Sequence, residues 1–191
     1  MYKRQGDILI INTGYHRYSW DQPDVLNPDA QGGVESKEFG FLVRHPGPSP
    51  EFFPWALDMK LKVVGVDCGC AEHPMNTPIR RMHDDHFQRA EAKLKAECSK
   101  SWDEMFPPDD YYELTHITMP KNHLLLAECL VGEIDKVKNQ RAWIMLMPVP
   151  YMEVETAGTR ACAMQAPEGM SDDEFFQIME SAQMLDMTIP F

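Results

Sequence analysis

The sequence predicts a layered α/β domain, and three patterns along the chain carry this prediction. The short run of aliphatic, mostly β-branched residues at 8–11 is typical of a strand that is buried on both faces. A helix pattern follows at residues 50–60, and a second apolar run at 61–67 ends in Asp67. Because strands and helices alternate in this order, we expect helices to flank a central sheet.

A long loop is expected between the first strand and the first helix. Residues 15–49 mix aromatic side chains with Pro, Gly, Asp and Asn and have no sustained period. Ser49 and Pro50 then suit the N-cap and the first turn of the helix at 50–60. Loops of this kind often border functional sites.

The rest of the chain is expected to add an insertion and three more strands. The insertion, at about residues 71–115, is charged and interrupted by prolines, and its pattern indicates a helix around 84–98. Apolar runs predict the three strands at 124–130, 142–147 and 160–164.

A capping-box pattern marks the start of a helical tail. Ser171 is followed by Glu174, and the apolar spacing beyond them predicts a last helix at about 172–184. We therefore expect one domain at residues 1–170 and a helical tail at residues 171–191.

Charge and cysteine content argue against several classes of protein. The formal net charge is −12, which opposes binding to nucleic acids, because phosphate backbones attract clustered Lys and Arg. The five cysteines are scattered and odd in number, so we expect free thiols in a reducing compartment. No apolar run of about 18 residues indicates a membrane span, and the first residues resemble a strand rather than a leader. These features predict a cytoplasmic protein that binds neither nucleic acid nor membrane.

Four segments carry a resemblance to a known family. The first begins with Gly-Asp and ends in Thr-Gly, and the second joins a Pro-Gly turn and a helix to a Gly-x-Asp strand. The third links a glutamate to a Gly turn and an Ile-Asp pair, and the fourth leads from a strand-ending proline to Arg-x-x-Ala. They lie at residues 6–14, 46–67, 125–137 and 148–163.

Together these segments resemble the C-terminal part of the cyclase family of metal-dependent hydrolases, which includes bacterial kynurenine formamidase and isatin hydrolase. The resemblance implies a swivelling β/β/α-like layered domain with a mixed central sheet and flanking helices, incomplete at its N-terminus. Members also carry the signature His-x-Gly-Thr-His-x-Asp-x-Pro-x-His, which supplies most metal ligands and the catalytic histidine. None of the seven histidines here has another four residues away, so this signature is absent.

The chain thus begins where a full-length member would already have used about 70 residues. We expect either that a second polypeptide supplies the missing elements or that the chemistry has been lost.

The resemblance implies that a later histidine, and a glutamate about a dozen residues beyond it, complete the metal site. His116 and Glu128 have this spacing, and we predict that they bind Zn or Mn. The alternative for His116 is an exposed loop histidine. For Glu128, a carboxylate within an apolar strand is costly unless it is paired or metal-bound, which favours a functional role.

Three further residues are expected to contact the substrate: Asp67, His123 and Trp20. Asp67 ends a buried strand, where α/β proteins often place site residues, although a carboxylate that only stabilises the following turn is an equal alternative. His123 either substitutes as a metal ligand or caps a strand, and Trp20 either lines a pocket or packs on the core. The Cys-Gly-Cys run at residues 68–70 is interpreted as a tight turn, because its spacing suits neither a redox pair nor a zinc site.

These observations predict one subunit of a heteromeric metal-dependent hydrolase that acts on a non-peptide amide, lactam or similar carbonyl of a small molecule. The expected partner is a second cyclase-family subunit that carries the missing signature and the general base. One alternative is a non-catalytic subunit that stabilises an active partner. Another is a self-sufficient homo-oligomer that joins His116, His123, Glu128 and Asp67 across an interface.

Overall fold

The computed structural model describes residues 6–19 and 41–183, which form two compact units. One unit comprises residues 2–134 and the other residues 135–191, and each is described by itself. The expected boundary between residues 170 and 171 stays a prediction. Within the described part of the chain, every helix is too short or too polar to cross a membrane.

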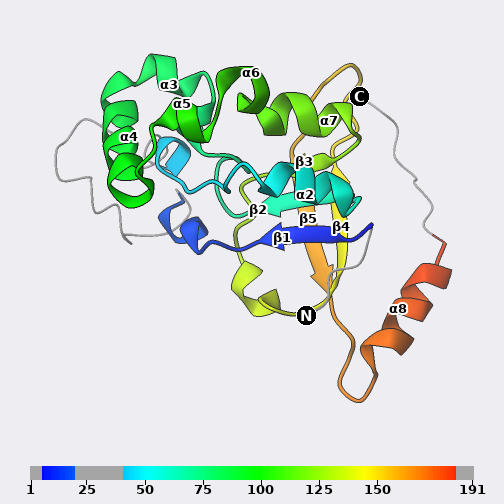
Figure 1. Cartoon of the computed structure of the whole chain (residues 1–191). Coiled ribbons are helices and arrows are strands. Elements are labelled where there is room, and N and C mark those ends of the chain that lie inside the picture. Colours follow the sequence, from blue (N-terminus) through cyan, green and yellow to red (C-terminus); the bar gives the residue numbers. More distant parts are fainter. Residues whose placement is uncertain (1–5, 20–40, 184–191) are drawn as a thin grey trace. The chain divides into compact units, whose positions relative to one another are not determined.

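The unit of residues 2–134 is built around a three-stranded parallel sheet in the order β1-β2-β3. Its strands are β1 (Ile8–Ile11), β2 (Val63–Val66) and β3 (Leu125–Ala127), each in a region where the sequence predicted a strand (Figure 1). Ile10 pairs with Gly65, and Gly65 pairs with Ala127. The sheet is therefore parallel throughout, whereas the resemblance implied a mixed sheet. Because the strands run in one direction, their carboxyl ends meet at one edge.

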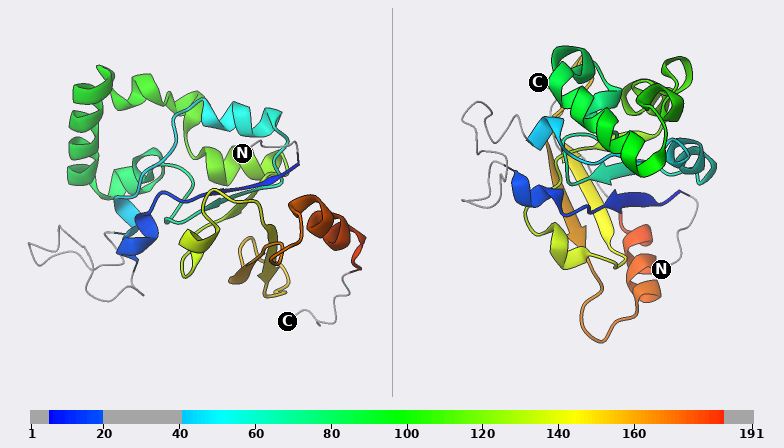
Figure 2. Two further views of the ribbon diagram at one scale, coloured as in Figure 1. Left: turned by 90° about the horizontal axis from the view of Figure 1, so that it is seen from below. Right: turned by 60° about the vertical axis from the view of Figure 1, so that its left-hand side comes forward.

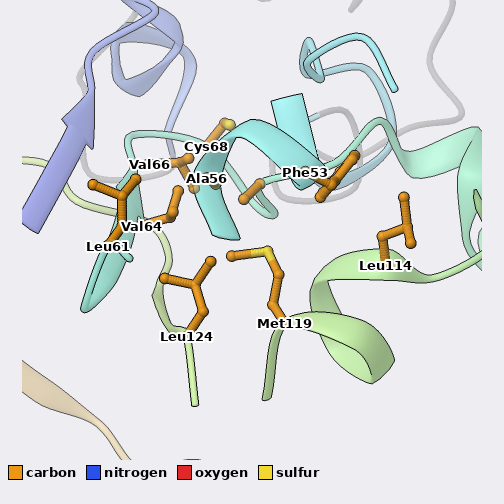
Figure 3. Packing of buried hydrophobic residues seen from close by; sticks show 10 residues of the cluster. Phe53, Ala56, Leu61, Val64, Val66, Cys68, Leu114, Met119 and Leu124 are labelled. Carbon is orange, nitrogen blue, oxygen red and sulfur yellow. The ribbon is translucent and has the colours of Figure 1, made fainter. Parts of the chain in front are cut away.

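Helices cover one face of this sheet. They are α2 (Phe52–Asp58), within the predicted 50–60, the π-helical turn η3 (Leu114–Thr118) and the short α7 (Met119–Lys121) (Figure 2). Their apolar residues bury Val64 and Val66, which alternate on that face of β2. Figure 3 shows this cluster, whose buried members include Phe53, Ala56, Leu61, Val64, Val66, Cys68, Leu114, Met119 and Leu124.

Close packing on the opposite face of β2 explains a glycine in the middle of that strand. A Cβ atom at Gly65 would lie 2.5 Å from Cδ1 of Ile10 and 2.8 Å from Cδ1 of Leu130. Side chains from both neighbouring segments therefore approach the backbone of β2 at this position. Gly65 allows the sheet to be covered tightly on this side.

The predicted insertion forms a helical subcluster with its own apolar centre. Its elements are η2 (Pro74–Asn76), α3 (Ile79–Met82), α4 (Asp84–Cys98), α5 (Trp102–Met105) and α6 (Pro108–Tyr111). The helix predicted at 84–98 is confirmed with the same bounds as α4. Met75, Phe87, Trp102 and Phe106 form the buried centre of this subcluster.

The predicted loop at 15–49 is described only in part. Residues 15–18 form the 3₁₀ turn η1 (Tyr15–Tyr18), which follows Gly14 with its positive φ of 83°. Glycine adopts this left-handed backbone without strain, so the chain turns sharply at the end of β1. Residues 20–40 lie outside the described part of the chain.

The unit of residues 135–191 contains an antiparallel hairpin and a helix. Its elements are β4 (Trp143–Pro148), β5 (Thr159–Met164) and α8 (Asp172–Ser181), and η4 (Ile134–Val137) begins at its boundary. The predicted cap of α8 is confirmed, because the Ser171 hydroxyl accepts a hydrogen bond from the Glu174 backbone N–H. The helix stops at Ser181, earlier than the predicted 184, because Ala182 has an extended backbone.

Candidate metal centre

The candidate site lies where the chain leaves β2 and β3. The turn after β2 contains Cys70 and Glu72, and Glu128 follows the last residue of β3. The pairing continues beyond the strands, because the backbone N–H of Cys129 donates to the carbonyl oxygen of Cys68 over 2.9 Å. This hydrogen bond holds the two segments side by side at the carboxyl edge of the sheet, which is where open parallel sheets commonly place their sites.

His116 reaches this edge from η3, the π-helical turn after the insertion. Glu113 precedes the turn with a positive φ of 51°. The buried carboxylate of Glu72 then accepts hydrogen bonds from the Leu114 backbone N–H at 3.0 Å and from the Asn76 amide at 3.3 Å. Because Glu72 is only 1% exposed, these bonds fix the turn firmly against the segment that follows β2. π-helical turns often occur at functional sites.

Three side chains of metal-ligand type meet at this point. A ring nitrogen of His116, the thiol sulfur of Cys70 and a carboxylate oxygen of Glu128 all lie within 4.8 Å of one another. The Nε2 atom of His116 is 3.9 Å from Oε1 of Glu128. Within residues 6–19 and 41–183, this is the one group of three His, Cys, Asp or Glu side chains with such spacing. The two predicted ligands, His116 and Glu128, are thus brought together.

The Glu128 carboxylate is in an environment that disfavours its charge. Its Oε1 atom is buried and has no hydrogen-bond partner among the described residues. Burial raises the pKa of Glu128 above its ordinary value, and the neighbouring Cys70 and His116 offset this effect only in part. An unsatisfied buried carboxylate oxygen is costly, and a cation beside it would remove the cost.

His116 is surrounded by groups that favour its protonated form. Hydrogen bonding to Cys70, followed by the interaction with Glu72, raises the pKa of His116 to about 10, although partial burial acts in the opposite direction. Without a metal, the imidazole therefore carries a proton near neutral pH. A metal ion at this position has to displace that proton.

This donor set fits a divalent transition metal. Thiolate, imidazole and carboxylate are the three ligand types that zinc uses in proteins. Donor atoms that share one zinc ion at about 2.0–2.3 Å lie roughly 3.3–3.8 Å apart, so the observed group needs to contract by about 1 Å. His116, Glu128 and Cys70 would hold the ion and would leave room in its coordination sphere for further ligands.

Asp67 is committed to contacts within the protein. Its side chain is fully buried, and Oδ1 accepts hydrogen bonds from the Thr13 backbone N–H at 2.9 Å and the Thr13 hydroxyl at 2.7 Å. Oδ2 lies 2.9 Å from Nδ1 of His16. Burial acts to raise the pKa of Asp67, but the hydrogen bonds from His16 and Thr13 outweigh it, so the pKa lies below its ordinary value. Asp67 thus ties the segment after β1 to the end of β2, and its substrate role stays a prediction.

His123, another predicted substrate contact, is not part of this cluster. His123 lies in an exposed turn with a positive φ of 58°, immediately before β3, whereas Glu128 follows the opposite end of that strand. Trp20 lies outside the described residues. The roles predicted for His123 and Trp20 stay predictions.

Cys70 is the ligand-type residue that the sequence did not reveal. Its spacing from Cys68 suggested only a tight turn, and Cys68 does stay in that role, because its thiol donates to the Cys70 carbonyl oxygen over 3.2 Å. Burial raises the pKa of Cys68 to about 12, so this thiol stays protonated. The one signal in the sequence that pointed to Cys70 was its position just beyond a buried strand.

The fold and the cluster together define an α/β protein with a potential metal centre at the carboxyl edge of a parallel sheet. Residues 2–73 match the model of the Cyclase family, whose description is "Putative cyclase". The predicted resemblance to the cyclase family is therefore confirmed over that stretch, which contains the first two of the four segments. The chain matches no curated protein and no solved structure.

Proposed function

We propose that this chain is one subunit of a metal-dependent hydrolase that acts on a non-peptide amide, lactam or similar carbonyl. His116 and Glu128 contribute to its metal centre. The observation that carries the proposal is the buried Oε1 atom of Glu128, which lacks a hydrogen-bond partner within the part of the chain that the structure describes and lies 3.9 Å from His116 Nε2. A divalent cation bound by these two groups would compensate the negative charge of the Glu128 carboxylate. It would therefore explain why the two side chains lie together.

The family match supports the type of chemistry. It covers residues 2–73, which include the loop after β1 and the turn that carries Cys70 and Glu72. The later segments around Glu128 and Arg160 resemble the same family in the sequence but lie beyond the matched stretch. A divalent ion in such a site supplies Lewis acidity, which polarises a carbonyl and makes water a stronger nucleophile near neutral pH.

The residues of this chain then have distinct tasks. Glu128 supplies negative charge at the ion, and His116 supplies a ring nitrogen. Glu72 and Thr115 position the imidazole of His116 on its Nδ1 side. Thr115 Oγ1 lies 3.1 Å from His116 Nδ1 and donates to Glu72 Oε1 over 3.2 Å. Carboxylates that orient a liganding histidine in this indirect way strengthen metal binding.

A second polypeptide is proposed to complete the site. The sequence has no His-x-Asp-x-Pro segment and no pair of histidines four residues apart, and these carry most of the metal ligands in the family that it resembles. The proposed partner is a cyclase-family subunit that provides the remaining ligands and a general base.

The test uses this chain together with a cyclase-family polypeptide that carries the missing signature. The two are purified separately and after co-expression, and hydrolysis of an N-formyl arylamine and of a lactam is measured with zinc or manganese present. We expect activity only in the joint preparation, and a loss of at least about 100-fold for Glu128→Ala and His116→Ala, since even residues behind the ligands contribute about 10–100-fold. The exposed Glu168→Ala is the matched control.

Two outcomes would contradict the proposal in different ways. If both alanine variants leave the activity of the joint preparation unchanged, the chain is a structural subunit that stabilises an active partner. If no complex forms and the two proteins are inactive together, the requirement for a second subunit is wrong.

A further inference from the structure

We infer that Cys70 is a third metal ligand of this chain and that its sulfur biases the site toward zinc and other thiophilic ions over manganese. The inference rests on the proposed function only in using the same site. It concerns the identity of the ion, which neither the fold nor the family match specifies.

The position of the Cys70 sulfur carries the first part of the argument. Its Sγ atom lies 3.2 Å from the Thr115 hydroxyl and 4.0 Å from Nδ1 of His116, and it belongs to the group whose donor atoms are within 4.8 Å of one another. Cys70 is buried, and its thiol also interacts with the Glu128 carboxylate. The sulfur therefore faces both predicted ligands, and its turn is anchored to the Glu128 segment through the hydrogen bond from Cys129 to Cys68.

Thr115 orients the donors, because a hydroxyl group has one proton to give. The fully buried Thr115 hydroxyl donates that proton to Oε1 of Glu72. Oε2 of Glu72 already accepts from Leu114 and Asn76, which is the arrangement of an acceptor-only carboxylate. The oxygen of Thr115 is then left as an acceptor for Nδ1–H of His116 and for the Cys70 thiol.

This assignment leaves the other ring nitrogen of His116 available to a metal. With Nδ1 protonated toward Thr115, the lone pair of a neutral imidazole sits on Nε2, the atom that faces Glu128. The same buried hydroxyl contacts the sulfur of Cys70. A single side chain thus holds two of the three donors in place before an ion arrives.

The choice of ion follows from the chemistry of sulfur. Thiolate ligands favour zinc and other soft ions, whereas carboxylate, carbonyl and water ligands suit manganese and magnesium. A site with only His116 and Glu128 would discriminate mainly by the general order of affinities of divalent metals. The sulfur of Cys70 adds a preference for zinc over manganese beyond that order. Its removal should therefore lower the ratio of zinc affinity to manganese affinity.

The other described thiols differ in their surroundings. The thiol of Cys68 is bound to a backbone carbonyl, Cys98 is exposed on α4, and Cys162 belongs to β5 of the unit of residues 135–191. Cys129 is half-buried next to Glu128, which makes it the one thiol that must be tested against Cys70.

The experiment is a titration of the full-length chain with Co²⁺, a spectroscopic substitute for zinc, followed by competition with Zn²⁺ and Mn²⁺. We expect a near-ultraviolet absorption from thiolate-to-cobalt charge transfer, and its loss in Cys70→Ser. The band should persist in Cys98→Ser and Cys129→Ser. In Cys70→Asp, which replaces sulfur by oxygen, the ratio of zinc to manganese affinity should fall at least about 10-fold.

Several results would overturn the inference. They are a band that survives in Cys70→Ser, a band that disappears only in Cys129→Ser, or an unchanged metal ratio in Cys70→Asp. Absence of cobalt binding would also overturn it, because three ligands from one chain suffice to hold such an ion. Failure of the hydrolase assay with an intact cobalt band would instead contradict the proposed function and leave this inference standing.

Discussion

The Nε2 atom of His116 lies 3.9 Å from Oε1 of Glu128, a carboxylate oxygen that is buried and has no hydrogen-bond partner among the described residues. Such a pair stabilises the metal-free protein poorly, since this carboxylate oxygen loses its hydration without gaining a hydrogen bond. This arrangement is typical of a carboxylate that binds a cation.

The first prediction separates metal binding from folding at Glu128. In Glu128→Gln, we expect the free energy of unfolding of the metal-free chain to change by less than about 0.5 kcal/mol, because no strong contact is lost. The affinity for zinc should fall at least about 10-fold, because a ligand charge is removed. Urea denaturation and calorimetric zinc titration check the two parts, with the exposed Glu168→Gln as control. Strong destabilisation without loss of zinc affinity would assign Glu128 a structural role.

The second prediction concerns the hydroxyl of Thr115. In Thr115→Val, the buried Glu72 carboxylate loses a donor, so the free energy of unfolding should fall by about 1–3 kcal/mol. Thr115→Ser keeps the hydroxyl and should retain most of the stability. Chemical denaturation of the two variants in parallel measures the difference. Equal stability of both would show that the hydroxyl does not anchor Glu72.

The third prediction concerns the close approach of two loops at Gly47. A Cβ atom on Gly47 would lie 2.1 Å from the backbone nitrogen of His73, so Gly47→Ala forces the backbone to move. We expect a loss of about 1–3 kcal/mol, the range of overpacked sites. At Gly158 a Cβ atom meets nothing within 4 Å, and Gly158→Ala should change stability by less than about 0.5 kcal/mol. Thermal denaturation of both variants tests the contrast, which fails if the two midpoints shift equally.

The fourth prediction is a pH dependence of stability that arises from His73. Burial lowers the pKa of His73 to about 3, from an ordinary value of 6.5, so the folded state holds the ring neutral. Its contribution is present above pH 6.5 and is lost as the pH falls from there toward 3, because the unfolded chain binds the proton first. The free energy of unfolding, measured by urea denaturation across this range, should decline with falling pH.

A variant isolates this effect of His73. The ring accepts a hydrogen bond from the Met75 backbone N–H at 3.1 Å, an N-cap interaction that the asparagine amide oxygen can replace. His73→Asn should therefore keep the cap and reduce the slope of stability against pH between about 6.5 and 3. An unchanged slope would mean that other groups dominate the acid dependence.

Local patterns account for the parts of the fold that the sequence predicted well. The strand at 8–11 and the helix at 84–98 were each predicted from the spacing of apolar residues within one short segment. Both have the predicted bounds. The pairing of β2 with β3 and the parallel direction of all three strands depend on contacts between distant segments, which a local pattern does not encode.

The residues of the candidate site also differ in whether the sequence predicted them. His116 and Glu128 were predicted through the spacing of motifs in the resembling family, and the structure brings them together. Cys70 and Thr115 are 45 residues apart and meet only because η3 packs against the turn after β2. No single segment of sequence contains that contact, so neither residue was predicted.

The parallel pairing of β2 with β3 also bears on the order of events during folding. Val63 pairs with Leu125, and the helical insertion occupies most of the chain between these two partners. Closing so long a loop has an entropic cost that slows the formation of the contact. The ligand cluster should therefore form late in folding, after the insertion has become compact, and a nascent chain that has not yet reached β3 has no assembled site with which to capture an ion.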